Sequence, residues 1–182
     1  KRIQSLAQIP LNEPQVQSLG LAIREHKTLR ELMLRGCNIM TQTMTPLAEA
    51  LETNLSLTSL SIEGNPNFGN GCTKKLLQAI EKNTRIIHLR LWRNRITVQG
   101  GRFLADFLQI YPQLVTLDLS CNQLGEEGSQ AIAAAVADHK HIKYLDLGSN
   151  KMGDKACKTL ADAICKNSSL ETLKLYWSDL SE

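Results

Sequence analysis

Residues 114–136 have the sequence LVTLDLSCNQLGEEGSQAIAAAV, in which one periodicity gives way to another. Leu117 and Leu119 alternate with polar residues, which is the period of two of a short strand with one buried face. After a polar turn, Ile132 and Val136 are four residues apart, which places both on one face of a helix. The stretch therefore predicts a strand, a loop and a helix in succession.

The same pattern recurs along the chain at an almost constant interval. The form L-x-x-L-x-L-x-x-N/C-x-L begins with an apolar residue at positions 29, 57, 86, 114, 142 and 170, so the intervals are 28, 29, 28, 28 and 28 residues. The copy at 57 carries one extra residue before Phe68, and the last copy ends with Ser178 and Leu180. The helix pairs also repeat: Leu47 and Leu51, Leu76 and Ile80, Leu104 and Leu108, Ile132 and Val136, Leu160 and Ile164. Such a series indicates a repeat architecture.

A single unit of this size cannot bury both its strand face and its helix face, so neighbouring units must stack. The strands then form a parallel sheet and the helices a second layer. Because a helix is roughly 10 Å wide and strands are about 4.8 Å apart, the stack must bend with the sheet inside. We expect an α/β solenoid, a horseshoe with a parallel sheet on its concave face and helices on its convex face.

The repeats resemble the ribonuclease-inhibitor class of leucine-rich repeats over residues 11–180. The stretches LAEAL at 47–51 and NQLGEEGSQAIAAAV at 122–136 are similar to repeats of NOD-like receptors and of the GTPase-activating protein for Ran. Tropomodulin also carries such repeats, but the strict 28-residue regularity fits it less well. The resemblance implies one leucine-rich repeat domain over residues 1–182, with about six repeats and a degenerate first unit that begins with Leu11, Leu19 and Ile23. We expect this domain to be a fragment of a longer protein.

The composition indicates a cytoplasmic protein without a cofactor or a metal. No apolar run approaches the roughly 18 to 20 residues that a membrane span needs, and the first residues lack the charged segment, apolar segment and cleavage site of a signal sequence. The five cysteines form no C-x-x-C pair, which favours a reduced protein, with Cys37 and Cys121 as structural thiols. Glycosylation-type triplets begin at Asn54 and Asn167, but Asn83 occupies the same repeat position, where an asparagine that ends a helix is a sufficient explanation.

Because the strand leucines belong to the core, information about a partner resides in the variable strand positions. Three rows are expected across the sheet. The first holds Glu31, Ser59, His88, Thr116, Tyr144 and Thr172; the second Met33, Ser61, Arg90, Asp118, Asp146 and Lys174; the third Arg35, Glu63, Trp92, Ser120, Gly148 and Tyr176. Neighbours in the second row predict two ion pairs, Arg90 with Asp118 and Lys174 with Asp146.

Charge is segregated along the array. Residues 84–102 contain five arginines and no acid, whereas residues 103–138 contain five acids and neither lysine nor arginine. Such a field favours a protein partner of complementary charge and argues against nucleic acid, whose backbone would meet the acidic repeat. An arginine-flanked tryptophan on this surface is typical of an interface anchor, although packing on a neighbouring side chain is the alternative. We expect a binding site centred on Arg90, Trp92, Arg93 and Asp118 and extended by Arg35, Tyr144, Asp146, Lys174 and Tyr176.

Tyr176 and Trp177 are expected in the final strand, which no polar capping unit follows. Two interpretations are open. Either the rings met further sequence in a longer protein, or the uncovered edge pairs with another molecule, as in self-association.

The sequence contains no catalytic motif, and His139 and His141 lack further ligands for a metal. We therefore expect a binding module and not an enzyme. The alternative is GTPase activation of the Ran-activator type, because RNRI at 93–96 places Arg93, Asn94 and Arg95 in a loop where an arginine can stabilise transition-state charge. The repeat itself explains Asn94, however, because its loop asparagine satisfies backbone groups.

Overall fold

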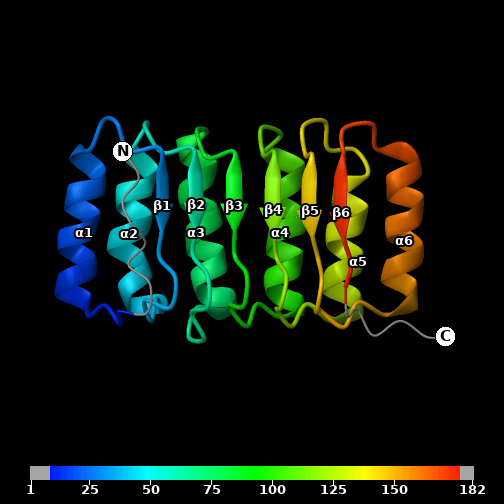
Figure 1. Cartoon of the computed structure of the whole chain (residues 1–182), viewed down its shortest axis with the longest axis horizontal. Coiled ribbons are helices and arrows are strands. Elements are labelled where there is room, and N and C mark those ends of the chain that lie inside the picture. The colour runs from blue at the N-terminus through cyan, green and yellow to red at the C-terminus, as the bar shows by residue number, and fades with distance from the viewer. Residues whose placement is uncertain (1–8, 177–182) are drawn as a thin grey trace.

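Short strands and longer helices alternate in two layers in the computed structural model, which describes residues 9–176 (Figure 1). The helices are α1 (Glu13–Glu25), α2 (Thr41–Thr53), α3 (Gly69–Asn83), α4 (Val98–Ile110), α5 (Gly125–Val136) and α6 (Gly153–Lys166). The strands are β1 (Glu31–Met33), β2 (Ser59–Ser61), β3 (His88–Arg90), β4 (Thr116–Asp118), β5 (Tyr144–Asp146) and β6 (Thr172–Lys174). They form one parallel sheet in chain order.

The strand register confirms the first two predicted rows. Leu60, Leu89 and Leu117 are paired across neighbouring strands and are fully buried, and the residues on either side of each leucine are paired in the same way. Beyond the strands, backbone hydrogen bonds extend the third row, because Gly64 N donates to Trp92 O and Arg93 N donates to Ser120 O. In Figure 1 the row of helices reaches beyond the row of strands at both ends, so the sheet lies on the inner side of the bend. The predicted α/β solenoid is confirmed.

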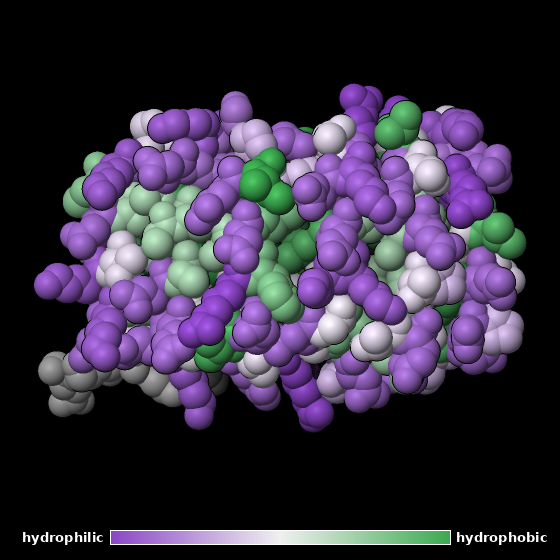
Figure 2. Space-filling view, turned by 180° about the vertical axis from the view of Figure 1, so that it is seen from behind, coloured by the Kyte–Doolittle hydropathy of each residue, from purple (hydrophilic) through white to green (hydrophobic). Residues whose placement is uncertain are grey.

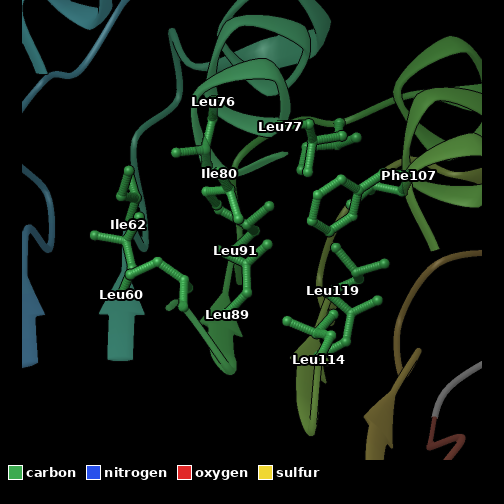
Figure 3. Close-up of a cluster of buried hydrophobic side chains, with 14 of the residues drawn as sticks. Leu60, Ile62, Leu76, Leu77, Ile80, Leu89, Leu91, Phe107, Leu114 and Leu119 are labelled. Atoms are coloured by element: carbon green, nitrogen blue, oxygen red, sulfur yellow. The ribbon is translucent and has the colours of Figure 1, made fainter. Parts of the chain in front are cut away.

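The core lies between the two layers. Figure 3 shows Leu60 of β2, Leu89 of β3 and Leu119, which directly follows β4, on the side of the sheet that faces Leu76 of α3 and Phe107 of α4. These side chains are almost completely buried. Burying one such side chain contributes about 1.5 to 3 kcal/mol relative to leaving it exposed. The repeats are thus held together by contacts that no single repeat can supply.

A ladder of buried asparagines supports the loops that follow the strands. Asn122 Oδ1 accepts the backbone N–H groups of Asn94 and Ile96, both at 3.0 Å, and its Nδ2 donates to Leu91 O and Leu119 O at 2.9 and 2.8 Å. Asn65, Asn94 and Asn150 make corresponding bonds to the repeat before their own. Each asparagine therefore satisfies backbone groups of the preceding repeat, which confirms the structural explanation of Asn94.

A second ladder closes the helix ends. Asn54 Nδ2 donates to Ile23 O at 2.6 Å and to His26 O at 2.9 Å, and Asn167 Nδ2 donates to Val136 O at 2.7 Å. At the corresponding place in the intervening repeats stand Asn83, Tyr111 and His139. The side chains of Asn83 and His139 also reach carbonyls of the preceding repeat, whereas Tyr111 OH donates to Ile86 O at the start of its own repeat. The amide groups of the glycosylation-type triplets are therefore engaged in the fold, as the helix-end explanation requires.

The predicted pattern fails at the last helix. Ile164 was expected on the buried face with Leu160, yet 44% of its surface is exposed. Leu160 is buried in the core, whereas no helix follows α6 within the described residues to cover Ile164. Ser178 and Leu180 of the last copy lie outside the described residues, as does Trp177.

Candidate functional site

The variable side chains of the concave face surround an open groove of about 280 Å³. It is lined by Arg35, Glu63, Trp92, Asp118, Ser120, Tyr144, Asp146, Lys174 and Tyr176. These residues come from the strands or from the turns directly after them, so the parallel register brings distant parts of the chain together. Seven of the nine predicted binding residues line the groove, and Arg90 and Arg93 do not.

Trp92 follows β3, and two guanidinium groups lie over its ring. The Cζ atom of Arg35 is 5.2 Å from the centroid of the indole ring, and that of Arg93 is 5.8 Å from it. Both distances allow cation–π attraction, which is about 0.5 to 1 kcal/mol at exposed sites. The side chain of Trp92 thus packs on its neighbours and also remains partly exposed to the groove.

Neither predicted ion pair forms among the described residues. Asp118 Oδ1 instead accepts the backbone N–H of Ser120 at 3.0 Å and its hydroxyl at 2.7 Å. Asp146 Oδ1 accepts Gly148 N at 3.0 Å, which is the same local turn one repeat later. A carboxylate beside its own turn satisfies a backbone donor without ordering a long cationic side chain, and this local bond replaces the predicted pair with Arg90.

Arg90 turns away from Asp118, toward the amino-terminal strands. Its Nη1 atom lies 4.0 Å from Glu31 Oε1 and 3.4 Å from Ser59 Oγ. Nearby, His88 bonds with Thr116 Oγ1 at 2.9 Å, and burial followed by the charge of Arg90 lowers the pKa of this histidine. Arg90 therefore belongs to a separate polar cluster beside the groove.

Asp146 is the most buried carboxylate of the groove, with 3% of its surface exposed. Burial raises its pKa above the ordinary value; the hydrogen bond from Gly148 opposes the rise, and the charge of Asp118 adds to it. Lys174 lowers this pKa through its charge, but by less than burial raises it. The floor of the groove between β4 and β5 therefore carries negative charge at a free-energy cost.

Two tyrosines form the carboxyl-terminal side of the groove. Lys174 Nζ lies 5.3 Å from the centroid of the Tyr144 ring, and Tyr144 OH is 3.4 Å from Asp146 Oδ2. The ring of Tyr176 covers Gly148, and 46% of its surface is exposed. Lys174 thus rests on a ring, where an ion pair with Asp146 was expected.

Glu63 and Ser120 line the groove, although neither was among the predicted binding residues. Both stand in the third row with Arg35, Trp92 and Tyr176. Membership of that row was visible in the sequence and would have identified them.

The loop at 93–96 combines exposed arginines with a buried asparagine. Arg93 and Arg95 adopt left-handed backbone conformations, with φ of 56° and 54°. This region is uncommon for residues other than glycine, and Gly36 and Gly64 occupy the position of Arg93 in earlier repeats. Because Asn94 is buried and bonded to backbone groups, only the two arginines can reach a partner from this loop.

The helical side offers a different surface. Figure 2 shows a mostly hydrophilic face with a hydrophobic strip near its centre. A hollow of about 150 Å³ between α3 and α4 is lined in part by Leu77, Phe103, Phe107 and Ile110. No helix within residues 9–176 is both long and apolar enough to cross a membrane. The same residues contain no group of three or more histidine, cysteine, aspartate or glutamate side chains placed to hold a metal ion.

Comparisons with known proteins agree with the repeat architecture. A family model described as leucine-rich repeat matches residues 112–133 and 138–161, and no curated protein matches the chain. A structure of leiomodin-1 actin-binding site 2 is 19% identical with a TM-score of 0.66, over 71% of this chain and 76% of that one. The tropomodulin C-terminal domain of Caenorhabditis elegans is 16% identical with a TM-score of 0.64, over 83% of this chain and 92% of that one.

A structure of a TLR13–ssRNA13 complex has a TM-score of 0.48 and 18% identity, over 84% of this chain and 23% of that one. At these identities the solved structures show the fold alone, and the ribonuclease-inhibitor class stays a prediction. The repeat spacing, the parallel sheet and the asparagine ladder give the chain a leucine-rich repeat fold, and the family model matches two of its repeats.

Proposed function

We propose that the chain is a protein-recognition module that binds its partner in the concave groove. The observation that carries the proposal is the convergence of three aromatic rings, Trp92, Tyr144 and Tyr176, with charged side chains on one hollow surface. Aromatic residues and arginine dominate the energetics of protein interfaces, whereas the strand leucines beneath them are committed to the core.

Contacts within the chain position the aromatic rings of this surface. Arg35 and Arg93 lie over the ring of Trp92, Lys174 lies over the ring of Tyr144, and the ring of Tyr176 covers Gly148. Side chains that are already ordered lose less conformational entropy on binding, so more of the contact energy remains as affinity.

Affinity capture from a cell lysate tests the proposal. Wild type is compared with Trp92→Ala, which removes the central ring, and with Phe103→Ala, which removes a ring from the hollow on the helical side. We expect a protein that is captured by wild type and Phe103→Ala and is lost with Trp92→Ala. Equal capture by all three variants, with each variant folded, would refute the proposal.

Two identities of the captured protein would refine the proposal. A small GTPase would support the alternative of GTPase activation, for which Arg93 and Arg95 are the available side chains. Actin is a second specific candidate, because the leiomodin-1 structure is described as an actin-binding site. Co-sedimentation with purified actin filaments and binding to monomeric actin test that candidate directly.

A further inference from the structure

Three carboxylates line the groove without a cationic partner. Glu63, Asp118 and Asp146 make no ion pair within 4.0 Å with any residue in the described part of the chain. Outside the groove, five glutamates form ion pairs with lysine or arginine: Glu31, Glu52, Glu126, Glu127 and Glu171. Exposed acids such as Glu81 and Asp106 form none among the described residues. The groove differs because it gathers three uncompensated acids in one hollow, and one of them, Asp146, has only 3% of its surface exposed.

The two cations of the groove are held on aromatic rings at its ends. Arg35 lies over Trp92 at 5.2 Å, and Lys174 lies over Tyr144 at 5.3 Å. Both cations thus flank the acidic floor and form no ion pair with it. A positive charge from outside the chain would meet carboxylates whose oxygens are engaged only by neutral donors.

Because Asp146 is buried, an incoming positive charge would stabilise its ionised form more than it would stabilise an exposed acid. Asp146 has only 3% of its residue surface exposed, although it lines the groove, and it lies near a second acid, Asp118, so its ionised form is penalised by lost hydration and by repulsion. An incoming cation would offset both effects in a partly desolvated setting, where charge-assisted hydrogen bonds are strong. The rings of Trp92 and Tyr176 also line the groove, and aromatic faces attract cations.

We propose that the groove accepts a basic side chain, arginine or lysine, from the partner protein, and that this side chain lies against Asp118 and Asp146. This inference rests on the proposed function and specifies the chemistry of the partner. An arginine fits best, because its planar guanidinium can donate to two carboxylates at once and stack on a ring. Phosphate groups would be repelled by the same acids, so a nucleic-acid backbone does not bind at this floor.

Titration of the isotope-labelled chain with hexaarginine tests the inference by nuclear magnetic resonance. We expect shifts of the Trp92 indole N–H and of the Ser120 and Gly148 amides, and none at these positions with hexaglutamate. Asp118→Asn and Asp146→Asn should each weaken hexaarginine binding by about tenfold, the loss expected for one charged hydrogen bond. Asparagine retains the shape of each side chain and an oxygen to accept the turn N–H, so both variants should fold.

Asp106→Asn is the matched control, because Asp106 is an exposed acid beside the hollow on the helical side. It should leave hexaarginine binding at the groove unchanged. Equal binding by Asp118→Asn, Asp146→Asn and wild type would overturn the inference, as would shifts confined to the helical side or a preference for hexaglutamate. If the captured partner still depends on Trp92 in that case, the proposed function stands and only the basic side chain is wrong.

Discussion

Gly148 and Tyr176 are in contact across neighbouring repeats. A Cβ atom on Gly148 would lie 2.7 Å from Cε1 and Cζ of the Tyr176 ring and 2.8 Å from its Cε2. Such distances are too short for real carbon atoms, so the ring can lie where it does only because residue 148 has no side chain. The absence of one side chain thus allows an aromatic ring to form a wall of the groove.

Gly148→Ala should therefore displace the Tyr176 ring and destabilise the protein by about 1 kcal/mol, the lower end of the cost of overpacking, because the ring is half-exposed and can move. In a double-mutant cycle, the same substitution in a Tyr176→Ala background should cost much less. Chemical denaturation of the four proteins measures the coupling. A Gly148→Ala cost that is equal in both backgrounds would show that the two residues do not interact.

The asparagine ladder predicts a large loss on removal of Asn122. Asn122→Ala leaves the buried N–H groups of Asn94 and Ile96 and the carbonyl of Leu91 without their partner. Each unsatisfied buried group costs about 1 to 3 kcal/mol, so we expect unfolding to become easier by about 3 kcal/mol or more. Asn67→Ala is the control, because Asn67 is exposed and bonds only to Asn38, and it should change stability by less than about 0.5 kcal/mol. Similar losses in the two variants would contradict the role of the ladder.

The buried ring of His139 leads us to expect that the stability of the fold decreases in mild acid. Burial, the largest cause, lowers its pKa below the ordinary value of 6.5, although the hydrogen bond with Tyr111 O opposes this shift. The unfolded chain then binds more protons than the folded chain below pH 6.5, so stability is fully present above that pH and is lost as the pH falls. Thermal melting between about pH 5 and pH 8 measures this loss.

His139→Asn should remove the contribution of this histidine. Asn167, one repeat later, donates to His139 O and accepts the N–H groups of Ser169 and Leu170, so an asparagine can make the corresponding bonds at 139. We expect the variant to fold and to lose less stability than wild type as the pH falls. An unchanged pH dependence would mean that another group, such as His88, accounts for it.

Substitution of Arg93 should affect stability and partner binding in different ways. Its left-handed φ of 56° is strained for an arginine, and glycine stands at this position in two earlier repeats. Arg93→Gly should leave stability unchanged or raise it by up to about 1 kcal/mol, but should weaken capture of the partner, because the cation over Trp92 is lost. Ser149→Gly, at φ 57° in the same repeat position, should affect stability in the same way and leave capture intact. A loss of stability in both variants would contradict the claim that the left-handed backbone is strained at Arg93 and Ser149.

The sequence predicted the strand register completely, because strand leucines at fixed intervals leave one alignment that buries all of them. Leu89 and Leu117 had to lie side by side, and the variable rows followed from that pairing. The helix faces were predicted equally well wherever a further repeat covers them. The prediction that Ile164 is buried was wrong, because periodicity identifies a face of a helix but does not show whether another element covers that face.

The side-chain partners within the rows could not be predicted in the same way. Backbone register places Arg90 opposite Asp118, but a long side chain reaches several alternatives of similar energy, and Asp118 has a closer donor in its own turn. The contact of Tyr176 with Gly148 depends on the absence of an atom, and the approach of Arg35 to Trp92 spans two strand intervals. Periodicity carries no information on either contact.

Site-specific photo-crosslinking tests most directly whether the groove binds a protein. A photoreactive amino acid replaces Glu63 in the groove or, as a control, Glu81 on the exposed helical side, and the chain is irradiated in a cell lysate. The account predicts a protein adduct from position 63 that disappears in a Trp92→Ala background, and no such adduct from position 81. An adduct from position 81 alone, or one from position 63 that persists without Trp92, would contradict recognition through the concave groove.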